Sequence, residues 1–171
     1  MFGTPGNGSL GHLTGVHLLQ LATGMRATHV PYPGGPPAQL ALLGGQLDYV
    51  IDTLGQYDEM IKAGKVRALA VTAPQRVPDR AIPTVAEAGF PQLLATVWID
   101  AAVPRGTPEP VVRRLNEAIN EALSTPDVRQ SLAGSSFRPV GGPPSELAAR
   151  MSDEATAVWK DLIARYSISV E

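Results

Sequence analysis

The stretch of residues 28–38 limits the fold of this chain more than any other segment. A short β-prone run ends at Val30, two prolines and the pair Gly34–Gly35 follow, and residues 38–43 form an apolar, helix-like run. This order predicts a strand, a tight loop containing Tyr32, and the start of a helix. Because a helix start carries unpaired N–H groups and the positive end of the helix dipole, the loop is predicted to form one wall of a site for a small anion. The alternative is a plain connection in which glycine and proline only shape the turn.

Strand-like and helix-like runs alternate along the chain, which is typical of an α/β protein. Besides the run that ends at Val30, strands are predicted over residues 47–51, 66–72, 93–103 and 137–140. Helices are predicted over residues 10–24, 38–44, 54–63, 84–89, 107–123 and 125–132, with a final helix whose apolar stripe runs from residue 147 to residue 162. Thr84 and Glu87 have the spacing of a capping box, in which the carboxylate reaches back to the N–H at the helix start.

A second glycine-rich stretch, residues 3–12, is predicted to be a loop that leads into the first helix. Ser9 is the expected N-cap, because its hydroxyl can accept from an N–H two or three residues later. His12 then falls in the first turn, where it either faces what the loop holds or is a surface or internally satisfied residue. The Gly-x-Gly pattern resembles part of a dinucleotide fingerprint. Without a strand before it and an acidic residue about 20 positions later, that match is weak.

Asp52 and Thr53 directly follow the strand predicted over residues 47–51. In open α/β sheets, ligands bind beyond the carboxyl ends of the strands. Both residues are therefore predicted to face the same site as Tyr32. The alternative is that Asp52 only caps the helix predicted after it.

Composition excludes several classes of function. The net charge of −2 over 171 residues gives no electrostatic footprint for nucleic acid. The absence of cysteine removes disulfides, thiolate metal sites and cysteine nucleophiles. No apolar run approaches the roughly 20 residues that span a bilayer. The first residues show neither the basic nor the apolar region of a secretory signal, so we expect no signal peptide in this chain.

The groups that most enzymes need do not occur together in this sequence. The histidines His12, His17 and His29 form no metal-binding spacing, and there is neither a nucleophile elbow nor a phosphate-binding loop with its lysine. Glycine-rich helix starts with hydroxyls nearby remain, and these are features of a binding protein. We therefore predict a binding protein without cofactor or metal rather than an enzyme. An enzyme that holds a phosphate or an acyl-coenzyme ester in these loops would instead show turnover that depends on Asp52 or His12.

Several motifs occur in a fixed order along nearly the whole chain. They are Gly8-Ser9-x-x-His12, Val30-Pro31-Tyr32-x-Gly34-Gly35, the runs at residues 44–48, 62–72 and 83–89, Trp98, and Pro104-x-Gly106-Thr107-Pro108. In this order they closely resemble the substrate-binding receptors of tripartite tricarboxylate transporters, also called Bug receptors.

The resemblance implies a type II periplasmic-binding-protein fold, in which two α/β lobes close over a small carboxylate. It assigns residues 1–95 to the second lobe, complete, and residues 96–171 to the returning C-terminal part of the first lobe, incomplete. Members of the family run to about twice this length, within the usual size of a two-domain chain. On this interpretation the chain is a truncated product or a fragment, and its exposed first-lobe surface favours a homo-oligomer.

The resemblance also implies which residues hold the ligand. The matching positions are Gly8, Ser9, His12, Tyr32, Gly34, Gly35, Asp52 and Thr53. Members of the family hold carboxylates with backbone amides, hydroxyls and bridging water. The implied partners are a small organic carboxylate and the membrane permease subunits of the transporter, with a periplasmic location and no nucleic acid. The alternative is a ligand-sensing effector module of a regulator with the same fold.

Overall fold

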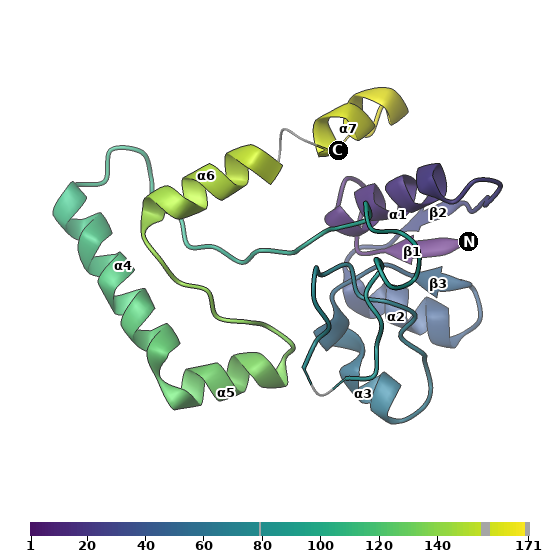
Figure 1. Cartoon of the computed structure of the whole chain (residues 1–171), viewed down its shortest axis with the longest axis horizontal. Helices are drawn as coiled ribbons and strands as arrows, with labels where there is room; N and C mark the ends of the chain where they lie inside the picture. Colours follow the sequence, from purple (N-terminus) through teal and green to yellow (C-terminus); the bar gives the residue numbers. More distant parts are fainter. Residues whose placement is uncertain (79, 155–157, 170–171) are drawn as a thin grey trace. The chain divides into compact units, whose positions relative to one another are not determined.

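The computed structural model describes residues 1–78, 80–154 and 158–169, which divide into two compact units (Figure 1). Unit 1 comprises Met1–Val97 and Trp159–Glu171, and unit 2 comprises Trp98–Val158. Among the described residues, no helix combines the length and the apolar character needed to cross a membrane.

Unit 1 is built on a parallel three-stranded sheet with the order β2-β1-β3. The central strand is β1 (Phe2–Thr4), and it is flanked by β2 (His29–Pro31) and β3 (Tyr49–Val50). Phe2 lies opposite His29 on one side and opposite Tyr49 on the other. All three residues of β1 are buried, so this short strand forms the centre of the lobe.

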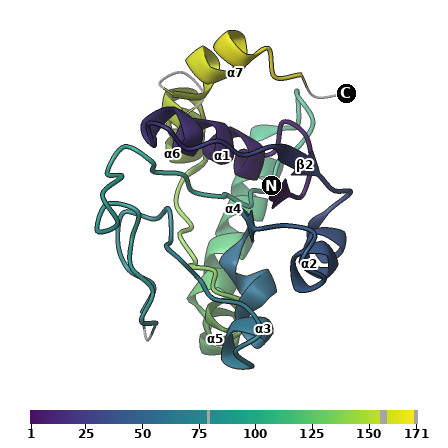
Figure 2. The same cartoon turned by 90° about the vertical axis from the view of Figure 1, so that its right-hand side faces the viewer.

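Two helices connect these strands and cover opposite sides of the sheet (Figures 1 and 2). Helix α1 (Leu10–Leu21) joins β1 to β2, and α2 (Gly35–Leu43) joins β2 to β3 by crossing β1. Their sides follow from chain direction, because connections of the same hand that run in opposite directions lie on opposite faces. Ala38 and Ala41 are the buried residues of α2 that lie toward the strands.

The remainder of unit 1 is mostly loop. After β3 come the 3-10 helix η1 (Leu54–Tyr57) and the short helix α3 (Asp58–Lys62). Arg80 donates to the buried carboxylate of Asp58 at 2.5 Å, which fixes the following loop against α3. From the far end of the chain, α7 (Lys160–Tyr166) contacts α1 and buries Leu162.

Unit 2 contains α4 (Glu109–Ser124), α5 (Pro126–Gly134) and α6 (Pro144–Glu154). The loop before α6 is held by α4, because Asn116 and Asn120 both donate to the carbonyl of Gly142, at 2.9 and 3.2 Å. The side-chain oxygen of Asn120 also accepts from the N–H of Gly142 at 2.7 Å. No residue of α4 is buried, and its apolar stripe at Val111, Leu115 and Ile119 is exposed.

The first part of the predicted glycine-rich loop is a strand, which corrects the prediction for residues 3–12. Gly3 and Thr4 follow Phe2 into β1, and neighbouring strands pair with it on both sides. Local composition favours a loop here, because two glycines and a proline fall within residues 3–6. Burial between two strands outweighs that weak local preference.

The strands predicted over residues 66–72, 93–103 and 137–140 are wrong. Val71 makes one isolated bridge with Thr84, and the described part of the chain offers residues 67–70 no backbone partner. Ala95 donates to the carbonyl of Thr72 at 3.1 Å, but no ladder follows from this contact. These runs have a β-forming composition. A β-prone run becomes a strand only where a neighbouring strand offers backbone hydrogen bonds to it.

The helix predicted over residues 84–89 also differs. The capping box at Thr84 forms, with the carboxylate of Glu87 accepting from its N–H at 2.7 Å, but the segment is a single turn closed by Gly89 and not a helix. For the final helix predicted across residues 147–162, the structure describes α6 and α7 on either side of residues 155–157. Residues 155–157 of that stripe lie outside the described residues.

Candidate functional site

The three strands of unit 1 all release their loops at the same edge of the sheet, because parallel strands share a direction. β1 leads into residues 5–9 and α1, β2 into residues 32–34 and α2, and β3 into residues 51–53 and η1. In the sheet order β2-β1-β3, the connection from β1 to β2 and the connection from β2 to β3 run in opposite directions across the sheet. This arrangement is the topological switch point at which open α/β sheets bind ligands.

The site residues predicted from the sequence all lie in these loops or in the helix turns that follow them. Backbone hydrogen bonds hold the loops together. Tyr32 donates to the carbonyl of Thr4 at 3.0 Å, and Gly34 donates to the carbonyl of Pro5 at 3.1 Å. On the other side of β1, Ile51 donates to the carbonyl of Gly3 at 3.1 Å. The predicted residues from the three loops are therefore brought to one edge.

The start of α1 is capped as predicted. The Ser9 hydroxyl accepts from the N–H of His12 at 3.3 Å and donates to the carbonyl of Gly6 at 2.7 Å. The N–H groups of Leu10 and Gly11 donate to no group among the described residues. The first turn of this 12-residue helix therefore presents free donors together with the positive end of its dipole.

Gly11 brings that helix start against the end of β3. A Cβ atom at Gly11 would overlap the carbonyl oxygen of Ile51, so no larger residue fits without moving backbone. Sequence reasoning missed this role. The available signal was a glycine inside a helical pattern, which costs about 1 kcal/mol against alanine and often marks a close backbone approach.

His12 is a buried, uncharged donor at the α1 start. It is 8% exposed, and its Nδ1 accepts from the N–H of Gly8 at 3.1 Å, which places the proton of the neutral ring on Nε2. Its ring stacks on His29 with centroids 3.8 Å apart. Burial lowers the pKa of His12. Burial and the neighbouring His12 lower the pKa of His29 to about 4.

His29 is the second residue that sequence reasoning missed. Its Nε2 lies 2.7 Å from the hydroxyl of Thr4, so it is tied to the end of β1 as well as to His12. A histidine at the start of a β-prone run is the only signal that the sequence offered for it. The stacked pair contributes polar, uncharged groups at neutral pH.

The start of α2 differs from that of α1, because the protein's own oxygen atoms lie against it. A Cβ atom at Gly35 would overlap the side-chain oxygen of Gln56 and would lie 3.0 Å from the carboxylate of Asp52. Pro36 and Pro37, the next two positions of α2, have no N–H. Gly34, the N-cap residue, has a φ of 103° and makes no side-chain cap.

The carboxylate of Asp52 is held by its own neighbours. It accepts from the N–H of Thr53 at 2.7 Å and from the hydroxyl of Tyr57 at 3.4 Å. Burial raises the pKa of Asp52, and these two hydrogen bonds oppose that rise. η1 has Thr53 as its N-cap without a side-chain hydrogen bond, so Asp52 is not the side-chain cap of that helix.

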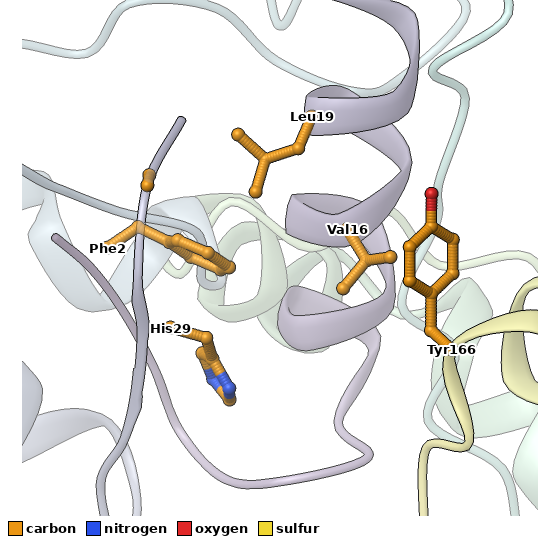
Figure 3. A pocket seen from close by; sticks show the side chains of 6 residues that line it. Phe2, Val16, Leu19, His29 and Tyr166 are labelled. Atoms are coloured by element: carbon orange, nitrogen blue, oxygen red, sulfur yellow. The ribbon is translucent and has the colours of Figure 1, made fainter. Parts of the chain in front are cut away.

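A small cavity of about 220 Å³ adjoins the site in unit 1 (Figure 3). Its lining is mostly apolar and comes from β1, α1, the start of β2 and α7; the residues are Phe2, Val16, Leu19, Ala27, His29 and Tyr166. His29 belongs both to this lining and to the stacked pair. Among the described residues, no group of three or more acidic or histidine side chains could hold a metal ion.

Residues 1–168 match the profile of the family described as "Tripartite tricarboxylate transporter family receptor". The chain belongs to this receptor family. A UPF0065 protein of Pseudomonas sp. (strain P51) is 38% identical over 94% of this chain and 49% of its own length. Protein BugT of Bordetella pertussis is 36% identical over 86% of this chain and 45% of its own length. The chain thus spans about half the length of these curated relatives, whereas it covers 97% of a UPF0065 protein of Pseudomonas knackmussii at 35% identity.

Solved structures of the receptor type share the fold. A structure described as a periplasmic transporter has a TM-score of 0.88 and 34% identity, over 99% of this chain and 56% of its own. An R. palustris protein solved with adipate has a TM-score of 0.85 and 32% identity over the same shares. MatC of Rhodopseudomonas palustris, with bound malate, has a TM-score of 0.78 and 31% identity over 95% and 56%. The predicted α/β fold of a periplasmic binding protein is confirmed, and the match is to receptors rather than enzymes.

Proposed function

We propose that this chain binds a small organic carboxylate as a receptor of a tripartite tricarboxylate transporter, or as part of one. The observation that carries the proposal is the convergence of three loops at the switch point of a parallel sheet, with free N–H donors at the start of α1. Two solved structures with similar folds support the proposal, because an R. palustris protein was solved with adipate and MatC of Rhodopseudomonas palustris was solved with malate.

The proposed ligand-binding residues are those predicted from the sequence. Gly8, Ser9 and His12 shape and cap the α1 start, where the ligand carboxylate is expected. Tyr32, Gly34 and Gly35 form the β2–α2 wall, and Asp52 and Thr53 form the β3 wall. The site offers neither a nucleophile with its base nor a metal cluster among the described residues, and we assign it no chemical step.

The organisation of the whole receptor belongs to the same proposal. We assign residues 1–95 to the second lobe of the family fold and residues 96–171 to the returning part of the first lobe, although the end of the chain, from Trp159, clusters with unit 1, where α7 contacts α1. The partners are then the membrane permease subunits of the transporter, and the location is the periplasm. The exposed stripe of α4 at Val111, Leu115 and Ile119 supports self-association through first-lobe surface.

A thermal-shift titration tests the binding proposal. The purified chain is melted with increasing concentrations of malate, succinate, adipate and citrate, with chloride at equal ionic strength as the control. A ligand that binds only the folded state raises the melting temperature in a concentration-dependent way. We expect such a rise with at least one acid. Cooperative melting that is unchanged by every acid would contradict the proposal.

A further inference from the structure

Residues 66–70 form an extended run that has no neighbouring strand. Exposure alternates with a period of two, as it does along a β-strand. The exposed side chains are Lys65, Arg67 and Leu69, and those between them are partly buried. No backbone hydrogen bond among the described residues involves the N–H or carbonyl groups of residues 67–70. The run, called the 66–70 edge below, is therefore an unpaired strand edge that can serve as a template for another extended segment.

The far end of the 66–70 edge is already held in strand geometry. Val71 donates to the carbonyl of Pro83 at 2.9 Å, and its own carbonyl accepts from the N–H of Val85 at 2.9 Å. These two hydrogen bonds form the isolated parallel bridge between Val71 and Thr84. Because one end is fixed, ordering the rest of the edge against a partner costs less conformational entropy than ordering a free loop.

The 66–70 edge borders an open groove with an excess of positive charge. The groove has a volume of about 790 Å³ and is lined by residues 61, 64–68 and 80–82. Arg80 is neutralised by the buried carboxylate of Asp58, and the other two charged side chains of α3 pair with each other at 2.8 Å. Lys65 and Arg67 form no ion pair with a described residue. These two cations leave the groove positively charged among its described residues.

We infer that the 66–70 edge is an interaction surface that binds an extended, acidic polypeptide segment as an added β-strand. The backbone groups of residues 67–70 supply the hydrogen bonds, and the side chains that face Lys65 and Arg67 supply the selectivity. Because residues two positions apart share a face of a strand, the partner carries two acidic side chains two positions apart. An apolar side chain two positions further on packs against Leu69, which is 62% exposed.

The unpaired backbone favours a polypeptide over other anions. A nucleic acid or an anionic lipid surface neutralises Lys65 and Arg67, but it has no alternating N–H and carbonyl groups with which to form a ladder. The inference does not rest on the proposed carboxylate site, because the 66–70 edge follows α3, whereas the ligand loops follow β1, β2 and β3.

The first test uses a fluorescently labelled, threonine-rich peptide in which two glutamates lie two positions apart and a valine lies two positions further on. This peptide and its reversed sequence cover both strand directions. Anisotropy titration of the unmodified chain is expected to show saturable binding of one of them. Lysines in place of the glutamates, or a proline in the centre, should weaken binding at least about tenfold, because the first reverses the charge and the second removes a ladder donor. A lysine peptide that binds as tightly would overturn the inference.

A charge reversal in the chain tests the same contact from the other side. In Arg67→Glu, we expect the acidic peptide to bind at least about tenfold more weakly and the lysine peptide to bind more tightly. Arg129→Glu, at an exposed position in α5, is the matched control and should leave both affinities unchanged. Because Arg67 is exposed, the melting temperature should not fall in either variant. Equal affinity of Arg67→Glu and the unmodified chain for the acidic peptide would contradict the inference.

Amide hydrogen exchange separates strand addition from charge attraction alone. We expect the acidic peptide to slow exchange within residues 67–70, and we expect heparin and phosphatidylserine vesicles at equal ionic strength to leave it unchanged. Peptide binding without this protection would leave only an electrostatic contact and would overturn the inference. The same protection in a concentration-dependent dimer without peptide would assign the 66–70 edge to a second copy of the chain, which also overturns it.

Discussion

The imidazole rings of His12 and His29 stack with their centroids 3.8 Å apart and their planes 11° from parallel. This contact joins the first turn of α1 to the start of β2. Charging either ring would place a cation against the other ring, in a position that is buried for His12 and partly buried for His29. The contact therefore links the protonation of the site to the stability of unit 1.

The first prediction concerns stability against pH. The pKa of His29 is about 4 in the folded chain and 6.5 without burial, so the unfolded chain binds more protons between these pH values. The contribution of His29 to the free energy of unfolding is complete above pH 6.5 and is lost progressively as the pH falls toward 4. Urea unfolding at pH 7.5, 6, 5 and 4.5 measures this loss.

His29→Gln is the control for that experiment, because glutamine can still donate to Thr4 but does not titrate. We expect the variant to show a smaller fall in unfolding free energy over the same pH range. Equal pH dependence in the variant and the unmodified chain would show that the stacked pair does not carry the effect.

The second prediction concerns the contact between Gly11 and Ile51. Gly11→Ala places a methyl group against a backbone carbonyl that cannot move cheaply, so we expect a loss of about 1–3 kcal/mol in the free energy of unfolding. Gly134→Ala, in α5, meets no neighbouring atom and should be neutral or stabilising by up to about 1 kcal/mol. Urea denaturation measures the free energy of unfolding of both variants. Equal changes in the two variants would show that the close approach of Gly11 to Ile51 does not limit the residue at position 11.

The third prediction concerns the α2 wall. Gly35→Val forces the side chains of Gln56 and Asp52 away from the α2 start, so we expect ligand binding to be abolished while the fold is largely retained. The expected loss of stability is about 1–3 kcal/mol. Circular dichroism and calorimetric titration measure the two effects, with Gly134→Val as the control. Unchanged affinity in Gly35→Val would remove this loop from the site.

The fourth prediction concerns the cap of α1. Ser9→Ala removes the acceptor for the N–H of His12, so we expect a loss of about 0.5–2 kcal/mol in the free energy of unfolding. Ser131→Ala, at an exposed position within α5, is the matched control and should change stability by less than about 0.5 kcal/mol. A Ser9→Ala variant as stable as the control would show that the hydroxyl is not a working cap.

The candidate site was predictable because strand ends are marked locally. Asp52 directly follows an apolar run, Tyr32 comes two positions after a short β-prone run, and parallel strands bring such positions to one edge. The central strand was not predictable in this way, because Gly3 and the nearby Pro5 have loop-forming composition and only pairing on both sides makes the segment a strand.

Predictions of strands from the sequence were wrong where a β-prone run has no neighbouring strand to pair with. Residues 66–72 have the composition of a buried strand, yet only Val71 makes a bridge, and Leu69 remains 62% exposed. Propensity reports what a segment would form beside a suitable neighbour, whereas the structure depends on whether that neighbour is present. Sequence patterns likewise do not indicate that side-chain oxygen atoms lie at the start of α2. This arrangement depends on the tertiary contacts of Asp52 and Gln56 with Gly35.

The central claim is that a carboxylate binds at the start of α1, and amide chemical shifts test it most directly. Malate and aspartate are titrated into the ¹⁵N-labelled chain, and the N–H resonances are followed residue by residue. The account predicts the largest saturable shifts at Leu10 and Gly11, with smaller shifts at Thr53 and few changes in α4 and α5. Saturable binding that leaves Leu10 and Gly11 unchanged, or no binding by any acid, would contradict it.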